Sequence, residues 1–241
     1  MFIFPGIGVL ANVAGIIAGG ITGTIFGDRI AERFKDTLLK TCALVTIFFG
    51  IGGTLKEMLV IDANGQLACA RSEMMLVSLL VGAFIGECID LEDRLESFGR
   101  YLRQKTGSNG DSRFVEGFVT ASLTVCIGAM AVIGSIEDRL MADPSILFAK
   151  TALDCIIVFI MSATYGRGCI FSALSVGVFQ GTIFLAAGLL APVMTPQALS
   201  DLSYVGNILI FCVGVNILGI THIRVANLLP ALVLATAWSW M

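Results

Sequence analysis

Charge is scarce in this chain, and that scarcity indicates the class of protein. Charged residues make up 14% of the 241 residues, whereas a soluble globular domain carries about 25%. Charged residues are few because the chain contains several apolar runs of about 18 residues or more. Such runs are typical of transmembrane helices. The sequence therefore predicts an all-α, polytopic membrane helix bundle. A formal net charge of −3 without a basic patch argues against nucleic acid as a partner.

Histidine and clustered cysteine are also lacking. His222 is the only histidine and lies beside an apolar run, which argues against His-based metal sites, catalytic triads and haem ligation. The seven cysteines are scattered without a C-x-x-C pair, so neither a disulfide framework nor a zinc site is expected. No H-E-x-x-H motif occurs. We therefore predict no catalytic residue, no metal site and no cofactor, and we do not expect an enzyme.

Eight apolar segments are candidate transmembrane spans. The third is short for a bilayer core of roughly 30 Å. The fourth contains Gly128 and Gly134 and is either a broken span or a re-entrant segment, so seven complete crossings is the alternative to eight. The segments cover about 3–26, 38–58, 74–89, 114–136, 146–165, 168–192, 203–220 and 224–241.

The distribution of lysine and arginine predicts the orientation. With the N-terminus outside, eleven of the 15 Lys and Arg face the cytoplasm. The exceptions are Lys56, Arg71, Arg139 and Lys150, which lie outside or within the membrane. No positive charge precedes the apolar run that begins at Phe2, so we expect this run to remain as a first span rather than a cleaved signal peptide.

Two apolar stretches begin alike and suggest an internal repeat. A Gly-Thr-Ile-Phe tetrapeptide occurs at 23–26 and again at 181–184. Spans one to three and six to eight would be inverted repeats if span four crosses fully, and parallel repeats if it is re-entrant. Chance similarity among glycine-rich segments is the alternative. The aligned pairs are Gly6 with Gly166, Gly8 with Gly168, Asn12 with Ser172, Gly52 with Gly214, Thr54 with Asn216, and 78–80 with 227–229.

The predicted organisation is a single integral membrane domain, 1–241, with four parts. These are a three-span unit (1–89), a cytoplasmic amphipathic linker (90–113), two connecting spans (114–165) and a second three-span unit (166–241). Within the linker, apolar residues recur on one helical face from Leu91 to Leu102 and include Leu95 and Phe98. This helix is expected on the membrane surface, against a partner protein, or as a plain tether.

Polar residues within the spans mark a candidate pathway. Lys150 and Asp154 share a helical face and form either a functional pair or a structural pair near the interface. Gly15, Gly19, Gly23 and Gly27 form a stripe that serves helix packing or lines a narrow path. The residues predicted to line an ion or solute pathway are Asp154, Lys150, Gln180, Asn216, Asn12, Ser122, Thr124, Gly128 and Asn227.

Several of these features occur in an order that resembles a known family. They are the Gly-x-Gly start with Asn12, the segment 126–135, the Lys150 and Asp154 pair, Gln180-Gly181, and the closing Asn-Leu-Leu-Pro at 227–230. Together they resemble the YqgA-like or YdfK-like family of bacterial inner-membrane proteins over nearly the whole chain. The resemblance implies a multi-pass protein of the bacterial inner membrane. Because the family's function is unknown, the resemblance implies no substrate and no site residues.

The function expected from these features is a small transporter or channel for an ion or small polar solute. The alternative is a non-transporting scaffold or regulatory protein that docks a cytoplasmic partner through the 89–105 helix. The expected surroundings are the lipid bilayer. A homodimer is also expected, because short spans with a glycine stripe leave a face available for a second copy.

Overall fold

The computed structural model describes residues 4–27, 29–61, 64–108, 110–127 and 129–240. Within these ranges the regular secondary structure is helical apart from one short antiparallel hairpin, in which Leu59 pairs with Cys69 and Ile61 with Leu67. The elements are α1 (Ile7–Gly27), α2 (Glu32–Met58), β1 (Leu59–Ile61), β2 (Leu67–Cys69), α3 (Ser72–Ile89), α4 (Leu91–Lys105), α5 (Phe114–Cys126), α6 (Ala129–Leu140), α7 (Ser145–Tyr165), η1 (Arg167–Phe171), α8 (Ser172–Leu190), α9 (Pro196–Ile217), η2 (Val225–Leu228) and α10 (Pro230–Trp238).

Six described helices are long and apolar enough to cross a membrane, and α5 with α6 adds a seventh span if the pair is counted as one. The all-α membrane bundle is therefore confirmed. The predicted eighth span at 224–241 is shorter than expected, since η2 has 4 residues and α10 has 9. At 1.5 Å per residue, α10 alone extends only about 14 Å. Pro230 begins α10 rather than kinking a longer helix, because its ring suits the first helical turn.

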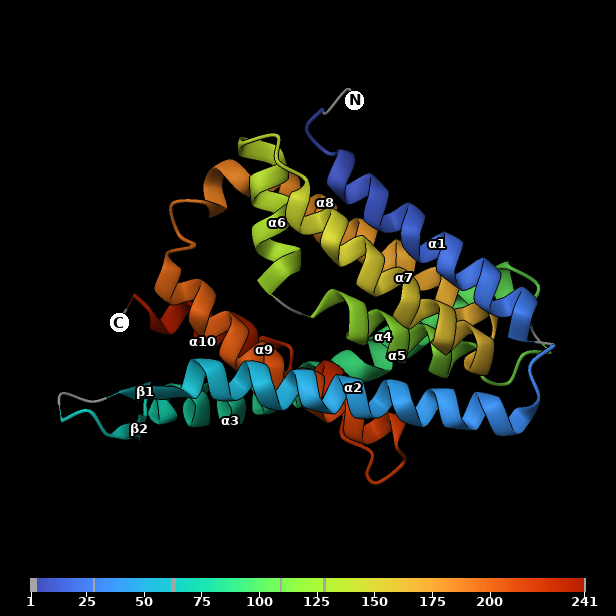
Figure 1. Ribbon diagram of the computed structural model, residues 1–241, viewed down its shortest axis with the longest axis horizontal. Helices are drawn as coiled ribbons and strands as arrows, with labels where there is room; N and C mark the ends of the chain where they lie inside the picture. The colour runs from blue at the N-terminus through green and yellow to red at the C-terminus, as the bar shows by residue number, and fades with distance from the viewer. Residues whose placement is uncertain (1–3, 28, 62–63, 109, 128, 241) are drawn as a thin grey trace. The chain divides into compact units, whose positions relative to one another are not determined.

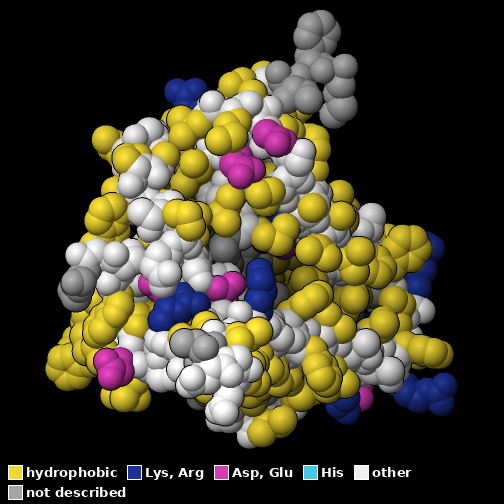
Figure 2. Space-filling view, turned by 60° about the vertical axis from the view of Figure 1, so that its left-hand side comes forward, with side chains coloured by type: hydrophobic (Ala, Val, Ile, Leu, Met, Phe, Trp, Pro, Cys, Tyr) yellow, Lys and Arg dark blue, Asp and Glu magenta, His cyan; other side chains and the backbone are white. Residues whose placement is uncertain are grey.

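Side chains on the outside of the structure fit a lipid environment. Leu185 and Leu189 are one helical turn apart on α8 and are 81% and 80% exposed. Large apolar patches are rare on proteins that face water, whereas lipid tails are as apolar as leucine. Hydrophobic side chains likewise occur over wide areas of the face seen in Figure 2, where charged side chains are few.

The chain forms two compact units that are interleaved in sequence. Unit 1 comprises 1–42, 93–126 and 130–192, and unit 2 comprises 43–92, 127–129 and 193–241. Each unit therefore combines segments from both halves of the chain.

The glycine stripe of α1 packs directly against α7 in unit 1 (Figure 1). A Cβ at Gly19 would overlap the carbonyl oxygen of Cys155, and one at Gly23 would overlap that of Phe159. Because contacts advance together along both helices, α1 and α7 run in the same direction. The packing interpretation of the stripe is therefore correct, and the stripe is occupied by a helix of the same chain rather than by a second copy.

Helices α5 and α6 are consecutive helices separated by a sharp bend. The two axes differ by 62°, and the break lies at the predicted position, although Gly128 itself is outside the described residues. Asp111, just before α5, lies beside Gly166 at the end of α7. Asp138 of α6 instead binds the N-terminus of α1. The pair therefore runs from one end of unit 1 to the other.

The predicted amphipathic helix is α4, and its apolar face is partly used within unit 1. The Phe98 ring packs edge-on against Phe118 of α5, with ring centroids 5.8 Å apart. Leu102 is buried, while Phe98 remains 40% exposed.

Unit 2 contains two antiparallel helix contacts that depend on glycine. A Cβ at Gly82 of α3 would meet Ala231 of α10, and one at Gly86 would overlap the Asn227 carbonyl. Similarly, Gly50 of α2 lies against Phe211 of α9. These contacts place α3 against α10 and α2 against α9, with each pair antiparallel.

An arginine network fastens the ends of three helices in unit 2. The Arg71 guanidinium donates to the Ser200 hydroxyl and the Asp201 carboxylate, both at 2.7 Å, and to the main-chain carbonyl of Glu57. The Asp201 side chain is 1% exposed and forms a buried ion pair with Arg71. Arg71 adopts a φ of 59°, which is unusual for a residue with a side chain. From the sequence, Arg71 was expected only to lie outside or within the membrane, and its ion pair was not predicted.

We expect Arg71→Met to lower the free energy of unfolding by about 2 kcal/mol, because it leaves the buried Asp201 carboxylate without its cation. Arg71→Lys should recover only part of this loss, since an ammonium cannot reproduce the guanidinium fork. Thermal unfolding of the purified protein in detergent measures both. Lys56→Met is the control, because the Lys56 side chain is 82% exposed. Equal melting temperatures for the two Met variants would contradict the role of Arg71.

Candidate functional site

The candidate site is a buried polar layer in unit 1, centred on Lys150 and Asp154 of α7. The Lys150 Nζ donates to both oxygens of the Asp154 carboxylate, at 2.9 and 2.7 Å. It also donates to the main-chain carbonyl of Val125, at 2.8 Å. Lys150 is 6% exposed and Asp154 3%. The pair is therefore buried within the unit, and Lys150 does not extend toward the membrane surface.

The break between α5 and α6 supplies one of these ligands. In an unbroken helix the Val125 carbonyl would accept the N–H four residues later. Here α5 ends at Cys126, so that carbonyl is one of the free groups of a helix C-terminus. An ammonium at this position satisfies the carbonyl and interacts favourably with the helix dipole.

Two buried amides lie at the same layer without satisfied hydrogen bonds. Asn12 of α1 is 0% exposed and Gln180 of α8 is 1% exposed. Among the residues that the structure describes, no partner is found for the side-chain nitrogen or oxygen of either amide. The Asn12 amide does lie within interaction range of the Asp154 carboxylate. Since buried polar groups are nearly always hydrogen-bonded, these two amides mark a polar position among apolar side chains.

The helix contacts place these residues on neighbouring turns of α1, α7 and α8. Ile16, Val158 and Val176 belong to one hydrophobic cluster that also contains Val125. Each is four residues from a polar residue on its own helix, namely Asn12, Asp154 and Gln180. Gly20 of α1 contacts Ile170 of η1, and Val13 of α1 contacts Gly177 of α8, so α8 runs antiparallel to α1. The four-residue steps on α1 and α8 therefore lead in the same direction from the cluster.

The other predicted pathway residues of unit 1 have ordinary structural roles. The hydroxyls of Ser122 and Ser175 lie 2.9 Å apart and join α5 to α8. The Thr124 hydroxyl donates to the Thr120 carbonyl on its own helix, at 2.7 Å. Gly128 lies outside the described residues.

Asn216 and Asn227 belong to unit 2 and hold loops there. The Asn216 side chain donates to the Ile223 carbonyl and accepts its N–H, at 2.7 and 2.8 Å. The Asn227 oxygen accepts the N–H of Glu92, whose carboxylate accepts the N–H of Ala226. The structure therefore brings Asn12, Lys150, Asp154 and Gln180 together and gives the two unit 2 amides a separate role.

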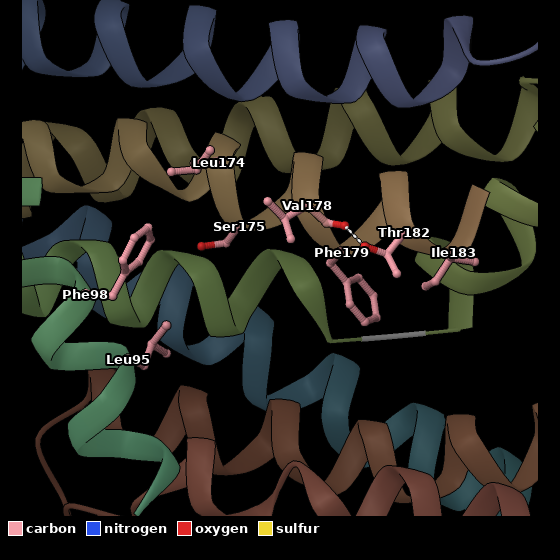
Figure 3. Close-up of a pocket in the computed structure, with 8 residues that line it drawn as sticks. All are labelled: Leu95, Phe98, Leu174, Ser175, Val178, Phe179, Thr182 and Ile183. Atoms are coloured by element: carbon pink, nitrogen blue, oxygen red, sulfur yellow. Dashed lines mark hydrogen bonds between the residues drawn. The ribbon is translucent and has the colours of Figure 1, made fainter. Parts of the chain in front are cut away.

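An apolar groove of about 580 Å³ lies between α4 and α8 of unit 1 (Figure 3). Its two hydroxyls, those of Ser175 and Thr182, are already engaged, and Thr182 donates to the Val178 carbonyl at 2.7 Å (Figure 3). The groove is therefore unsuited to a polar solute. It is lined by Leu95, Phe98, Leu174, Ser175, Val178, Phe179, Thr182 and Ile183.

Sequence reasoning missed Asp138, which is fully buried beside the start of α1. Its carboxylate accepts the N–H groups of Gly6, Gly8 and Val9, at 3.1, 3.0 and 3.2 Å. Ala131, Ser135 and Asp138 are all 0% exposed and lie at i, i+4 and i+7 of α6. This spacing could have identified Asp138 from the sequence, since it places Asp138 on the same helical face as Ala131 and Ser135.

The buried pair, the interrupted span and the lipid-compatible surface define a multi-pass α-helical membrane protein. The chain matches the family described as "Protein of unknown function (DUF554)" over residues 7–240 and belongs to that family. The resemblance inferred from sequence motifs is therefore confirmed.

Two bacterial relatives cover nearly the whole chain. The uncharacterized membrane protein YdfK of Bacillus subtilis is 30% identical over 227 residues, covering 94% of this chain and 93% of the relative. The uncharacterized protein YqgA of Escherichia coli is 29% identical over 246 residues, covering 96% and 98%. No solved structure matches.

Proposed function

We propose that the protein is a small membrane transporter or channel for an ion or small polar solute, and that the polar layer of unit 1 is its binding site. The observation that carries this proposal is the burial of the Asn12 and Gln180 amides in the same unit as the buried Lys150–Asp154 ion pair. Ionisable groups at membrane depth are expensive and usually functional. Interrupted helices supply main-chain ligands at the binding sites of many transporters.

The proposed halves are inverted repeats, and the helix contacts support this. α1 lies against α8, α2 against α9, and α3 against α10, with each pair antiparallel. Gly6 and Gly166, which align in the repeat, both have positive φ values, of 98° and 86°. Each precedes a helix, and each lies beside an aspartate carboxylate, Asp138 and Asp111 respectively. A broken but complete fourth span gives the inverted rather than the parallel arrangement.

The outward N-terminus and the homodimer also remain proposals. Outward placement rests on the bias of lysine and arginine. The glycine stripe no longer argues for a dimer, because α7 occupies it. Similarly, the scaffold alternative loses support because α5 covers part of the α4 face that a partner would use.

We expect the wild-type protein in proteoliposomes to transport at least one member of a panel of inorganic ions and small polar solutes. Asp154→Asn should reduce that flux at least about 100-fold, because it leaves Lys150 without its counter-charge in the site. Gln180→Ala should reduce it more moderately, about 10-fold, through one lost polar contact. Flux is measured with radiolabelled solutes or ion-sensitive dyes.

The matched control is the Lys40–Asp36 pair, which has the same i, i+4 spacing and side chains that are 60% exposed. Asp36→Asn should leave flux unchanged. Wild-type protein that is folded and monodisperse but carries no solute of the panel would overturn the proposal. So would an Asp154→Asn variant that transports normally.

A further inference from the structure

We propose that the groove between α4 and α8 of unit 1 binds one acyl chain of an anionic phospholipid, whose phosphate is held by Lys105 at the end of α4. The groove has a volume of about 580 Å³, which lies within the range of about 300–1,000 Å³ for small-ligand sites. It is separate from the polar layer, and its ligand does not depend on whether the protein transports a solute.

The wall of the groove is suited to hydrocarbon. None of the eight residues that line it is charged. Leu174 and Val178 of α8 are 44% and 61% exposed, and the hydroxyls of Ser175 and Thr182 are already engaged. A polar ligand would give up hydrogen bonds with water and find few replacements here, whereas an acyl chain has none to give up.

The groove follows α8 over the depth of about one membrane leaflet. Leu174 lies in the first turn of α8 and Ile183 near its middle, and nine residues of helix extend about 14 Å. The hydrocarbon core is about 30 Å thick. The candidate span that contains α8 begins at Arg167, so the Leu174 end is nearer the membrane surface. Figure 3 shows Leu95 and Phe98 of α4 at this same end.

A row of side chains leads from the groove to a cation. The ring of Phe98, which lines the groove, stacks on Tyr101 with centroids 6.4 Å apart. The Lys105 ammonium lies 5.6 Å from the centre of the Tyr101 ring and donates to its hydroxyl at 3.2 Å. Tyrosine is common at the level of lipid headgroups. Because an ammonium has three donors, Lys105 can bind a phosphate while it keeps the contact with Tyr101.

The charges of α4 favour an anionic headgroup over a zwitterionic one. The acidic residues of this helix all lie in its first half, where Asp93 and Glu96 pair with Arg100. The last turn carries the basic residues Arg103 and Lys105. Clustered basic residues beside a membrane attract anionic lipids. The end of α4 is therefore complementary to a phosphate that has no cation of its own, as in phosphatidylglycerol.

The dimensions of the groove favour an acyl chain over a helix from a second copy. A volume of about 580 Å³ along about 14 Å of α8 corresponds to a mean cross-section of about 40 Å². A helix with its side chains is about 10–12 Å in diameter, so its cross-section is roughly two to three times larger. A single hydrocarbon chain is narrower than a helix and can follow such a groove.

Native mass spectrometry of the delipidated full chain in detergent tests the headgroup. Titration with dioleoylphosphatidylglycerol should show a first lipid bound about fivefold more tightly than dioleoylphosphatidylcholine, the factor expected for one cation near the headgroup. Lys105→Met should abolish this preference, whereas Lys40→Met, which removes a lysine that is 60% exposed, should keep it. Equal wild-type affinities for the two lipids, or a preference that survives Lys105→Met, would overturn the proposal.

Filling the groove tests the acyl chain. Val178→Trp should weaken the binding of dioleoylphosphatidylglycerol at least about tenfold, because the indole ring takes the space of buried methylene groups. Leu189→Trp is the control, since Leu189 is 80% exposed on the same helix and does not line the groove. Leu174→Trp blocks the other end of the groove and replaces Val178→Trp if that variant does not fold.

Three results would refute the acyl chain as the ligand. The first is a groove-blocked variant that binds the lipid as tightly as Leu189→Trp does. The second is glycerol phosphate bound as tightly as the whole lipid, which would show a phosphate site that does not use the groove. The third is a lipid-free wild-type dimer that Val178→Trp converts to a monomer, which would show that a second copy fills the groove.

Discussion

Gly23→Ala should lower the free energy of unfolding by about 3 kcal/mol, at the upper end of the range for overpacking. The added Cβ would overlap the Phe159 carbonyl, which is main chain and cannot rotate away. Relief requires α1 to separate from α7, and that separation would also loosen the contacts at Gly19 and Gly27. For a chain of this size the melting temperature should fall by roughly 6–12 °C.

Gly188→Ala is the matched control for this prediction. Gly188 also lies in a membrane-spanning helix, but a Cβ there would meet nothing within 4 Å. Alanine should therefore be neutral or slightly stabilising, by up to about 1 kcal/mol, because it favours the helix more than glycine does. Thermal unfolding in detergent, followed by tryptophan fluorescence or size-exclusion chromatography, measures both variants. Equal stability of the two would show that the α1–α7 contact does not need glycine.

The helices were predictable because the bilayer imposes a length and an apolar composition on each span. The glycine stripe likewise predicted a close helix contact, since four glycines four apart leave one side of α1 bare. The stripe could not predict that α7 is the helix packed against it. The contact on α7 is made by main-chain carbonyls, which every residue has. The ends of the spans were less predictable, as α9 begins at Pro196 instead of 203 and α10 is short.

The candidate site was predicted only in part. Lys150, Asp154, Asn12 and Gln180 attracted attention because polar residues are rare in spans, and the structure gathers them in one layer. The same argument also selected Asn216 and Asn227, which hold loops in unit 2. Rarity identifies a polar residue in a span but gives no information on which helices meet. The Val125 carbonyl was not predictable at all, because any residue at that position supplies the same main-chain oxygen.

Asp138→Ala should lower the free energy of unfolding by roughly 3–5 kcal/mol, since it leaves buried N–H groups at the start of α1 without an acceptor. The three N–H donors belong to Gly6, Gly8 and Val9. The carboxylate also interacts favourably with the positive end of the helix dipole. Asp138→Asn should recover little of the loss, because its amide nitrogen would face donors that need an acceptor.

Asp143→Ala is the control, because this carboxylate also serves a helix start but lies in the exposed loop before α7. It accepts the N–H of Ser145 at 3.0 Å. Hydrogen bonds from the side chain and the backbone of Ser145 lower the pKa of Asp143. Its small stabilising effect should therefore be present at neutral pH and disappear as the pH falls through that lowered pKa. At pH 7, Asp138→Ala should lower the free energy of unfolding several times more than Asp143→Ala does. Thermal unfolding in detergent measures both variants. Similar losses would show that burial of the Asp138 carboxylate adds nothing to stability.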